Sequence, residues 1–390
     1  MSVGNVELAV EALLDADHPI KRAAAAWASE HLTDPTLADR DRNSVFWSEG
    51  LSRIAQYGVF SLMAPTELGG QARSLSEWLL TLEGLGLGCE DHGLVFAAGA
   101  QVLSTQNVLQ RFGTADQKQR YLIPLLHGER RAGFCMSEPH AGSDAFSLTT
   151  TAARCADGYL LNGHKSWITF APVADFFVVF ASTNPAAGQW GISAFLVDAS
   201  TPGVCAGENR EKMGLRTTPF ADVVLDGCTV PEENLLGPLG AGASMFSAVL
   251  EDERAFLFAG ELGGLERLLQ QCVAHARSRA QFGQPIGNFQ AVAHRLADMK
   301  LRHETARTLM YKTALLAQSG QSITLASALT KLHTTESALT SALDAVRIHG
   351  ARGYVSEYGL ERMTRDAVGG LFTSGTSEVQ RNIIARLLGL

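Results

Sequence analysis

The order in which the hydrophobic periodicity changes along this 390-residue chain restricts its fold more than any other feature. Up to about residue 130 the apolar side chains recur at helical spacing, for example over 44–57 and 75–87. β-Rich runs separated by turn residues follow as far as Pro231, and helical spacing returns from Gly240 to the end. Because helices and strands occupy separate blocks and do not alternate, the pattern excludes a doubly wound sheet and predicts an α+β fold.

Local signals divide the chain further. Asp157-Gly158 and Asn162-Gly163 lie between β-rich runs, and both dipeptides predict hairpins because such turns need positive φ angles. The longest uncharged run, 176–197, is broken by Asn184-Pro185, so we interpret it as two short buried strands and not as a membrane helix. The last block predicts four long helices, over about 242–278, 288–319, 322–350 and 362–388. We therefore expect three domains: a helical domain over 1–130, a β domain over 131–238 and a four-helix bundle over 239–390.

Charge and cysteine usage exclude several classes of partner. With 32 Lys and Arg against 40 Asp and Glu, the net charge of −8 disfavours binding to nucleic acid phosphates or to anionic membrane surfaces. The six cysteines include no C-x-x-C pair and the histidines lack ligand spacing, so we expect neither a disulfide framework nor a metal site. The N-terminus shows no signal-peptide pattern, and we expect a cytoplasmic protein.

Two segments imitate functional motifs. Gly84-Leu85-Gly86-Leu87-Gly88 resembles a dinucleotide-binding loop, but Cys89 stands in the place of the third glycine and no strand precedes it. The pattern therefore favours close packing between helices. Ser143 lies in an Ala-Gly-Ser-Asp sequence and not in G-x-S-x-G, which argues against a hydrolase nucleophile.

Four segments contain the residue types that a flavin requires. A flavin needs an aromatic wall, small hydroxyl donors for its ring, and guanidinium or backbone groups for its pyrophosphate. The segments are 134–144 (FCMSEPHAGSD), 162–169 (NGHKSWIT), 279–290 (RAQFGQPIGNFQ) and 357–381, which starts EYGLERMTRDA and ends GTSEVQR. Together with 212–216 (KMGLR) and 230–237 (VPEENLLG), they resemble the acyl-CoA dehydrogenase family, in the same order and over nearly the whole chain.

The resemblance implies the fold, the cofactor and the partners of that family. It implies a helical N-terminal domain, a β-barrel-like middle domain and a C-terminal four-helix bundle, assembled as a homodimer or homotetramer with FAD at the subunit interface. It also implies an acyl thioester substrate, carried by coenzyme A or by a carrier protein. An electron-transferring flavoprotein is the implied electron acceptor.

The resemblance also assigns site residues. The implied cofactor-binding residues are Phe134, Met136, Ser137, Gly142, Ser143, Trp167, Thr169, Arg279, Gln281, Phe282, Gln290, Arg347, Gly350, Thr376 and Glu378. Those from Arg279 to Gln290 resemble residues that reach the adenosine diphosphate of a neighbouring subunit's FAD. The implied substrate contacts are Ser143, Glu251, Arg254, Ser374 and Gly375. Taken alone, Trp167 has a simpler interpretation as a core aromatic, and Arg279 as a solvated helix-end charge.

The sequence departs from the family at the residue that removes the α-proton of the substrate. Many members carry a glutamate directly before the Gly-Thr of the last motif, where this chain has Ser374, and a serine without a base partner cannot do this at neutral pH. Glu253 offers a replacement, because it shares an apolar helical stripe with Val249 and Leu257 and matches the base position of isovaleryl-CoA dehydrogenase. Desolvation there is expected to raise its pKa. The alternative is that the charges of 251–254 form a solvated face or an intrahelical pair.

Two further consequences concern the acyl pocket and the cofactor. Ser374 keeps the backbone N–H that holds the thioester carbonyl in the family, but its small side chain opens volume that favours a branched or cyclic acyl group. Arg347 and Ala351 replace the usual Gln and second Gly of the Gln-x-x-Gly-Gly-x-Gly segment. Arg347 can still pair with the pyrophosphate, whereas Ala351 leaves the detail of the adenosine diphosphate contact open.

These observations predict FAD-dependent α,β-desaturation of an acyl thioester. Glu253 takes the α-proton while the β-hydrogen leaves as hydride to flavin N5, and Arg254 and Glu251 help to position the base and the pantetheine arm. Two alternatives stay open. One is a flavin oxidase or monooxygenase on the same fold, and the other is a non-catalytic flavin-binding protein.

Overall fold

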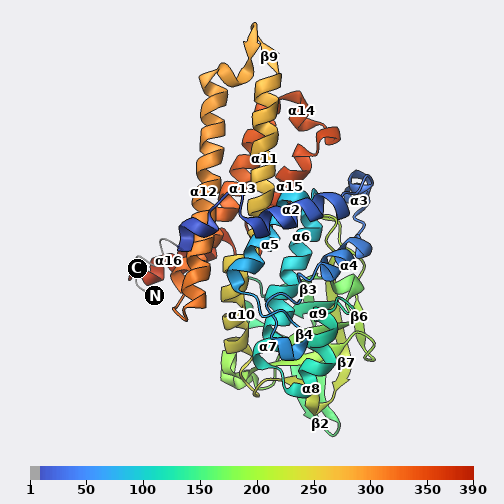
Figure 1. Cartoon of the computed structure of the whole chain (residues 1–390). Helices are drawn as coiled ribbons and strands as arrows, with labels where there is room; N and C mark the ends of the chain where they lie inside the picture. Colours follow the sequence, from blue (N-terminus) through green and yellow to red (C-terminus); the bar gives the residue numbers. More distant parts are fainter. Residues whose placement is uncertain (1–8) are drawn as a thin grey trace.

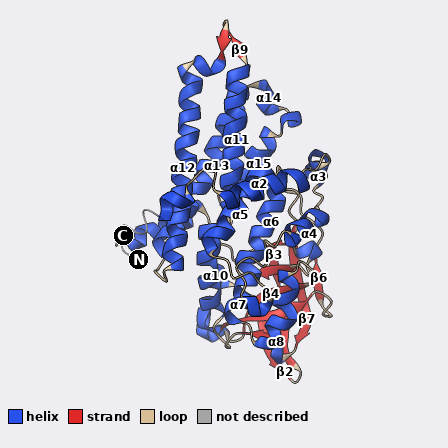
Figure 2. Cartoon of the chain, in the orientation of Figure 1, coloured by secondary structure: helices blue, strands red, loops and turns tan. Residues whose placement is uncertain are grey.

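Three blocks of secondary structure follow one another in the computed structural model, which describes residues 9–390. Helices form the first block, strands the second and helices again the third (Figure 1). The strands of the second block gather at one end of the molecule, and the long helices of the third block project at the other (Figure 2). The order of helices and strands predicted from the hydrophobic periodicity is therefore confirmed.

The first block is built around α5 (Leu75–Gly88) and α6 (His92–Ala100), most of whose residues are buried. Ser74 starts α5 with a capping box. The helical pattern over 44–57 yields α4 alone, because Ser44 has a left-handed φ of 54° that ends the preceding helix. The other helices of this block are α2 (Pro19–His31), α3 (Leu37–Asn43), α4 (Ser48–Gln56), α7 (Asn107–Phe112), α8 (Ala115–Gln117) and α9 (Ile123–Leu126).

The glycine-rich segment 84–88 lies inside α5, where it packs against other helices. A β-carbon on Gly86 would lie 1.8 Å from the carbonyl oxygen of Gly260 in α11 (Ala259–Ser278), and one on Gly84 would lie 2.4 Å from that of Lys21 in α2. Any side chain at these positions would push the helices apart. The helix-packing interpretation of the segment is confirmed.

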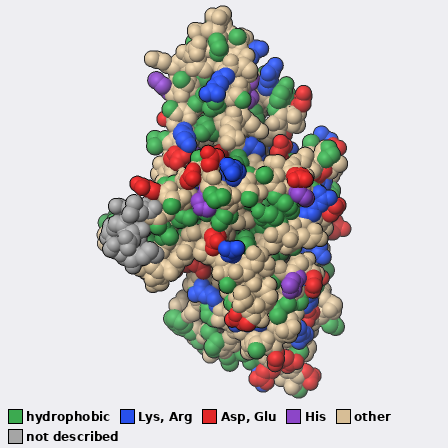
Figure 3. Space-filling view, in the orientation of Figure 1, with side chains coloured by type: hydrophobic (Ala, Val, Ile, Leu, Met, Phe, Trp, Pro, Cys, Tyr) green, Lys and Arg blue, Asp and Glu red, His purple; other side chains and the backbone are tan. Residues whose placement is uncertain are grey.

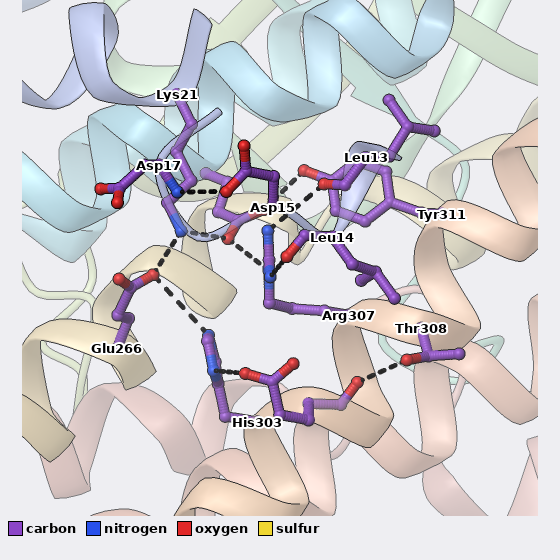
Figure 4. Close-up of polar contacts among 12 residues, drawn as sticks. Leu13, Leu14, Asp15, Asp17, Lys21, Glu266, His303, Arg307, Thr308 and Tyr311 are labelled. Atoms are coloured by element: carbon purple, nitrogen blue, oxygen red, sulfur yellow. Dashed lines mark hydrogen bonds and ion pairs between the residues drawn. The ribbon is translucent and has the colours of Figure 1, made fainter. Parts of the chain in front are cut away.

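A buried group of charges joins the first block to the helical bundle (Figure 4). Glu83 on α5 accepts a hydrogen bond from Arg307 Nε at 2.7 Å and lies 3.3 Å from Lys21 Nζ, which also contacts Glu266 at 2.6 Å. Glu83, Glu266 and His303 place possible metal-ligand atoms close together. Both carboxylates are already paired with cations, so we assign this group a structural role.

The second block is an eight-stranded sheet with the order β6-β7-β3-β2-β4-β5-β8, in which β1 pairs with β4. Apolar side chains of β2, β3, β4, β5 and β7 share one core, so the sheet curves around it. The uncharged run 176–197 forms two buried strands, as predicted. The strands are β1 (Ala132–Cys135), β2 (Thr151–Cys155), β3 (Gly158–Thr169), β4 (Phe176–Ser182), β5 (Ile192–Asp198), β6 (Val204–Ala206), β7 (Phe220–Val230) and β8 (Leu235–Leu236).

One of the two predicted hairpins forms. Asp157-Gly158 closes the β2–β3 hairpin, but the hairpin predicted at Asn162-Gly163 is wrong, because both residues lie within β3 and neither has a positive φ. At this point β3 continues beside β7, which carries one more residue in a bulge. The Asn162 side chain accepts a hydrogen bond from the Gly227 N–H in that bulge at 2.8 Å. Pairing with a distant strand thus satisfies the backbone groups that a local turn would have used.

The third block contains the helical bundle, and two of its four predicted helices are broken. The helix predicted over 242–278 turns at 257–258, which allows three consecutive apolar residues, 256–258, to be buried. The helix predicted over 362–388 is interrupted where Ser374 and Gly375 adopt φ angles of 56° and 93°. The helices are α10 (Gly242–Phe256), α11, α12 (Gln290–Gln318), α13 (Thr324–His349), α14 (Ala351–Tyr354), α15 (Leu360–Gly369) and α16 (Ser377–Leu387).

The surface carries charges of both signs. Lys and Arg are interspersed with Asp and Glu over the face drawn in Figure 3. Within residues 9–390, none of the helices combines the length and the apolar character needed to cross a bilayer.

Candidate active site

Glu253 lies in the last turn of α10 and contacts Ser374 in the loop between α15 and α16. The Ser374 hydroxyl donates a hydrogen bond to Glu253 Oε1 at 2.6 Å. Desolvation by the surrounding protein raises the pKa of the Glu253 carboxyl, and the Ser374 hydrogen bond and the Arg254 charge partly offset this rise. The structure therefore brings together the predicted base and the residue that replaces the family's usual base.

The loop that carries Ser374 is fixed by buried polar side chains. Gln380, fully buried on α16, donates from Nε2 to the Gly375 carbonyl at 2.9 Å and to the Ser374 carbonyl at 3.4 Å. Lys331 Nζ donates to the Leu371 carbonyl at 3.2 Å. The Ser374 N–H makes no hydrogen bond with any described residue, so this backbone donor is available to a ligand.

The charges around Glu253 do not form a solvated face. Glu251 accepts a hydrogen bond from the Thr324 hydroxyl at 2.6 Å, and Asp252 accepts one from the Asn107 side chain at 3.0 Å. Arg254 is buried, and its Nε has no hydrogen-bond partner among the described residues. Desolvation lowers the pKa of the Arg254 guanidinium. The solvated-face interpretation of 251–254 is therefore wrong, since the helix packs this segment against its neighbours.

A bulge in β3 directs Trp167 out of the sheet. Between the Lys165–Val223 and Ile168–Ala221 pairs, β3 carries one more residue than β7, and Trp167 adopts a φ of 66° there. Its side chain is 51% exposed, with the Arg210 guanidinium 4.9 Å from the ring centroid. The interpretation of Trp167 as a core aromatic is therefore wrong, because the bulge leaves about half of its side chain exposed to solvent.

The two motifs of the β domain meet beside Trp167. The Ser166 N–H donates to the Ser137 carbonyl at 2.9 Å, so 134–144 and 162–169 run side by side. Ser137 and Thr169 are partly exposed, whereas Met136 is buried. A β-carbon on Gly142 would have no neighbour within 4 Å, so the space beside that backbone is open. An exposed indole, two accessible hydroxyls and an open glycine backbone fit the ring system of a flavin.

Except for Phe134 and Ser143, which lie in the β domain with Trp167, the remaining predicted cofactor residues lie in the third block. Arg279, Gln281 and Phe282 lie in and beside a small hairpin of β9 (Ala280–Gln281) and β10 (Gln284–Pro285), at the far end of the bundle from the sheet (Figure 1). Phe282 is 94% exposed. Phe134 is partly buried among aromatic side chains. Thr376 caps α16. The other predicted residues are exposed: Gln290, Arg347, Gly350 and Glu378. An exposed aromatic and guanidinium groups suit an adenosine diphosphate presented by another subunit.

Sequence reasoning missed the ionic contacts of two site segments. Lys165 pairs with Glu138 inside the β domain, and Asp344 accepts hydrogen bonds from Arg347, Arg295 and Arg302. In the sequence, Lys165 is visible as a lysine in a β-rich run and Arg347 as an arginine at a helix end. Neither signal identifies the partner, which lies on another element.

A small cavity lies one helical turn beyond Glu253. Its apolar walls include Leu257 and Phe96, and its lining also includes His92, Glu261 and Asp366. The Leu215 N–H donates to Asp366 at 2.6 Å, which joins α15 to the 212–216 segment. Desolvation raises the pKa of Asp366 to about 6.

Comparison with known proteins places all three blocks in one family. The family models named acyl-CoA dehydrogenase, N-terminal, middle and C-terminal domain, match residues 15–129, 133–228 and 240–389. An L-prolyl-(peptidyl-carrier protein) dehydrogenase of Pseudomonas fluorescens is 41% identical over 96% of this chain and 99% of its own. The crystal structure of the prolyl acyl carrier protein oxidase AnaB is 39% identical, with a TM-score of 0.93 over 95% of this chain and 98% of that one. The structure of PigA with FAD and proline is 35% identical, with a TM-score of 0.92 over 96% and 98%.

Proposed function

This chain belongs to the acyl-CoA dehydrogenase family, and we propose, from that premise, that its substrate is a prolyl group carried as a thioester on a peptidyl-carrier protein. The family and the α+β fold class predicted from the sequence are confirmed. The chain is an oxidoreductase that desaturates acyl thioesters with FAD as cofactor. The finer assignments that follow are our proposal.

The observation that carries the proposal is the Glu253–Ser374 contact. Glu253 is the ionisable group we assign as acceptor of the substrate's α-proton, because its raised pKa makes it a stronger base than an ordinary carboxylate. FAD, when bound, supplies the hydride acceptor. Ser137, Trp167 and Thr169 would hold the flavin ring, and the free Ser374 N–H would hold the thioester carbonyl and stabilise the developing enolate.

The small side chain at position 374 supports a ring-shaped acyl group. A glutamate there would extend into the space beside Glu253, whereas Ser374 ends at its hydroxyl and donates to the carboxylate at 2.6 Å. A five-membered prolyl ring is compact and cyclic, as the expected pocket requires. Two relatives whose names or descriptions specify a prolyl substrate, at 41% and 39% identity, add to this argument.

The assembly and the electron acceptor belong to the same proposal. We infer a homodimer or homotetramer in which Arg279, Gln281 and Phe282 reach the FAD of a neighbouring subunit, since Phe282 is 94% exposed in one chain. An electron-transferring flavoprotein would reoxidise the flavin. A flavin oxidase on the same fold is the second candidate, because the AnaB structure is described as that of an oxidase.

Anaerobic titration of the FAD-loaded protein tests the proposal. We expect an L-prolyl-carrier protein to bleach the flavin absorbance and to lose two hydrogens by mass, and free L-proline to do neither. Bleaching by straight-chain acyl-CoA but not by the prolyl carrier protein would overturn the substrate assignment. Bleaching by no thioester would leave a flavin-binding protein without this activity, and rapid oxygen consumption by the reduced protein would favour the oxidase.

A further inference from the structure

We propose that Ser374 is a positioning residue for Glu253, and that Gln380 holds Ser374 in the conformation this task requires. The inference rests on the proposed function, because it concerns how the assigned base is oriented and tuned. It assigns a role to the residue that stands where many relatives carry the base itself.

The geometry leaves one oxygen of the base free. Ser374 Oγ donates to Glu253 Oε1 at 2.6 Å across 121 residues of sequence, and no hydrogen bond from any described residue reaches Oε2. A carboxylate held through one oxygen cannot rotate freely about its last bond. The hydrogen bond therefore directs Oε2 as the proton-accepting atom.

The backbone at Ser374 is unfavourable for a residue with a side chain. Its φ of 56° lies in the left-handed region, where glycine is preferred, and the next residue, Gly375, has a φ of 93°. The fully buried Gln380 side chain donates from Nε2 to the carbonyls of both residues, so it holds the loop in this conformation. A serine in this strained backbone conformation is explained if its hydroxyl has a function there.

The same hydrogen bond adjusts the basicity of Glu253. Donation to the charged form favours ionisation, so the Ser374 hydroxyl opposes the desolvation that raises the pKa of this carboxyl. Among the described ionisable groups, the neighbouring Arg254 also lowers the pKa of Glu253. Glu251 on α10 raises the pKa of Arg254, Arg254 in turn lowers the pKa of Lys331 on α13, and Asp252 faces Asn107 and Arg111.

Two substitutions at position 374 separate positioning from loop structure. Ser374→Gly removes the hydroxyl but relieves the left-handed backbone, so we expect unchanged or higher thermal stability with a Glu253 pKa raised by about one unit. Ser374→Thr keeps the hydroxyl but adds a β-branch at positive φ, so we expect lower thermal stability with the wild-type pKa of Glu253.

Gln380→Met is expected to shift the pKa of Glu253 in the same direction as Ser374→Gly. Ser377→Ala, which removes a buried hydroxyl at the end of the same loop, is the matched control and should shift nothing.

Two readouts keep this test separate from that of the proposed function. The first is infrared difference spectroscopy of carboxyl protonation against pH, with Glu253→Gln subtracted, which needs no substrate. The second is the pH profile of flavin reduction, in which Ser374→Gly should lose roughly tenfold in rate below the apparent pKa. An unchanged infrared pKa in Ser374→Gly, or an equal shift in Ser374→Thr, would overturn the inference. If the infrared shift occurs but no thioester reduces the wild-type flavin, the proposed function fails and the positioning contact stands.

Discussion

Lys165 and Glu138 form a buried ion pair that joins the two segments carrying Trp167 and Ser137. Lys165 Nζ lies 2.8 Å from Glu138 Oε1, and the two side chains are 0% and 3% exposed. Lys165 also donates to the Met136 carbonyl at 3.1 Å. The pair therefore holds together, from inside, the edge of the β domain that we propose to face the flavin.

Removing one member of this pair is expected to destabilise the domain strongly. Burial tends to raise the pKa of Glu138, but the Lys165 charge and the hydrogen bonds from Lys165, Thr150 and Thr149 lower it to about 2. Glu138→Gln leaves the Lys165 ammonium buried without a counter-ion, which costs about 3–5 kcal/mol in free energy of unfolding. Denaturant unfolding measures this, and Glu232→Gln, on an exposed pair with Arg154, is the control that should change little. Recovery of stability by adding Lys165→Met would identify the uncompensated charge as the cause.

Glu253→Gln is expected to abolish flavin reduction while FAD stays bound. The amide can still accept the Ser374 hydrogen bond but cannot take a proton, so the rate should fall by roughly 100- to 10,000-fold. Stopped-flow bleaching with the prolyl-carrier protein gives the rate, and flavin absorbance after gel filtration gives the occupancy. Glu49→Gln, an exposed carboxylate on α4, serves as the control. A wild-type bleaching rate in Glu253→Gln would rule out this base.

The stability of the protein is expected to depend on the protonation of Asp366. Because desolvation raises its folded-state pKa from 3.8 to about 6, the folded state binds more protons than the unfolded state between these values. Asp366 therefore contributes its full stabilisation below the unfolded-state pKa of 3.8, and this contribution is lost as the pH rises through the folded-state pKa of about 6. The free energy of unfolding that is lost in this way is about 3 kcal/mol.

Asp366→Asn isolates this contribution, since the amide oxygen can still accept from the Leu215 N–H. Unfolding free energies of both proteins, measured from about pH 4 to about pH 7, should converge in acid and differ most at neutral pH, where the variant is the more stable. A difference that does not change with pH would contradict the assignment of a raised pKa to this group.

Phe282→Ser is expected to weaken FAD binding without altering the fold of the chain. Phe282 is 94% exposed at the bundle tip, so its removal leaves no cavity, but the loss of an aromatic contact across subunits should reduce FAD affinity by roughly tenfold or more. Flavin fluorescence titration of the apoprotein measures the affinity. Trp190→Ala, at another exposed aromatic, is the control. Equal FAD affinity in Phe282→Ser and wild type would argue against a cofactor shared between subunits.

Ser374→Glu is expected to narrow the acyl pocket and to move the preference towards short, straight acyl chains. It also places a second carboxylate beside Glu253, and like charges in contact raise the apparent pKa of the pair. Flavin reduction by a panel of acyl thioesters, compared with wild type, reports both effects. An unchanged substrate profile would show that the side-chain volume at position 374 does not set the acyl preference.

Three features could be predicted from the amino-acid sequence: the order of the three blocks, the family and the candidate base. Periodicity and motifs carry this information because each is local, and Glu253 could be singled out because the apolar residues Val249 and Leu257 lie four positions before and after it. Which side chains contact one another depends on the packing of distant elements and is visible only in the folded structure. Ser374 contacts Glu253, which lies 121 residues away in the sequence. Lys165 pairs with Glu138 of a neighbouring segment. Asn162-Gly163 lies at a bulge between β3 and β7 and does not form a hairpin. Such contacts depend on how distant elements pack, and no local pattern specifies the partner of a buried charge or hydroxyl.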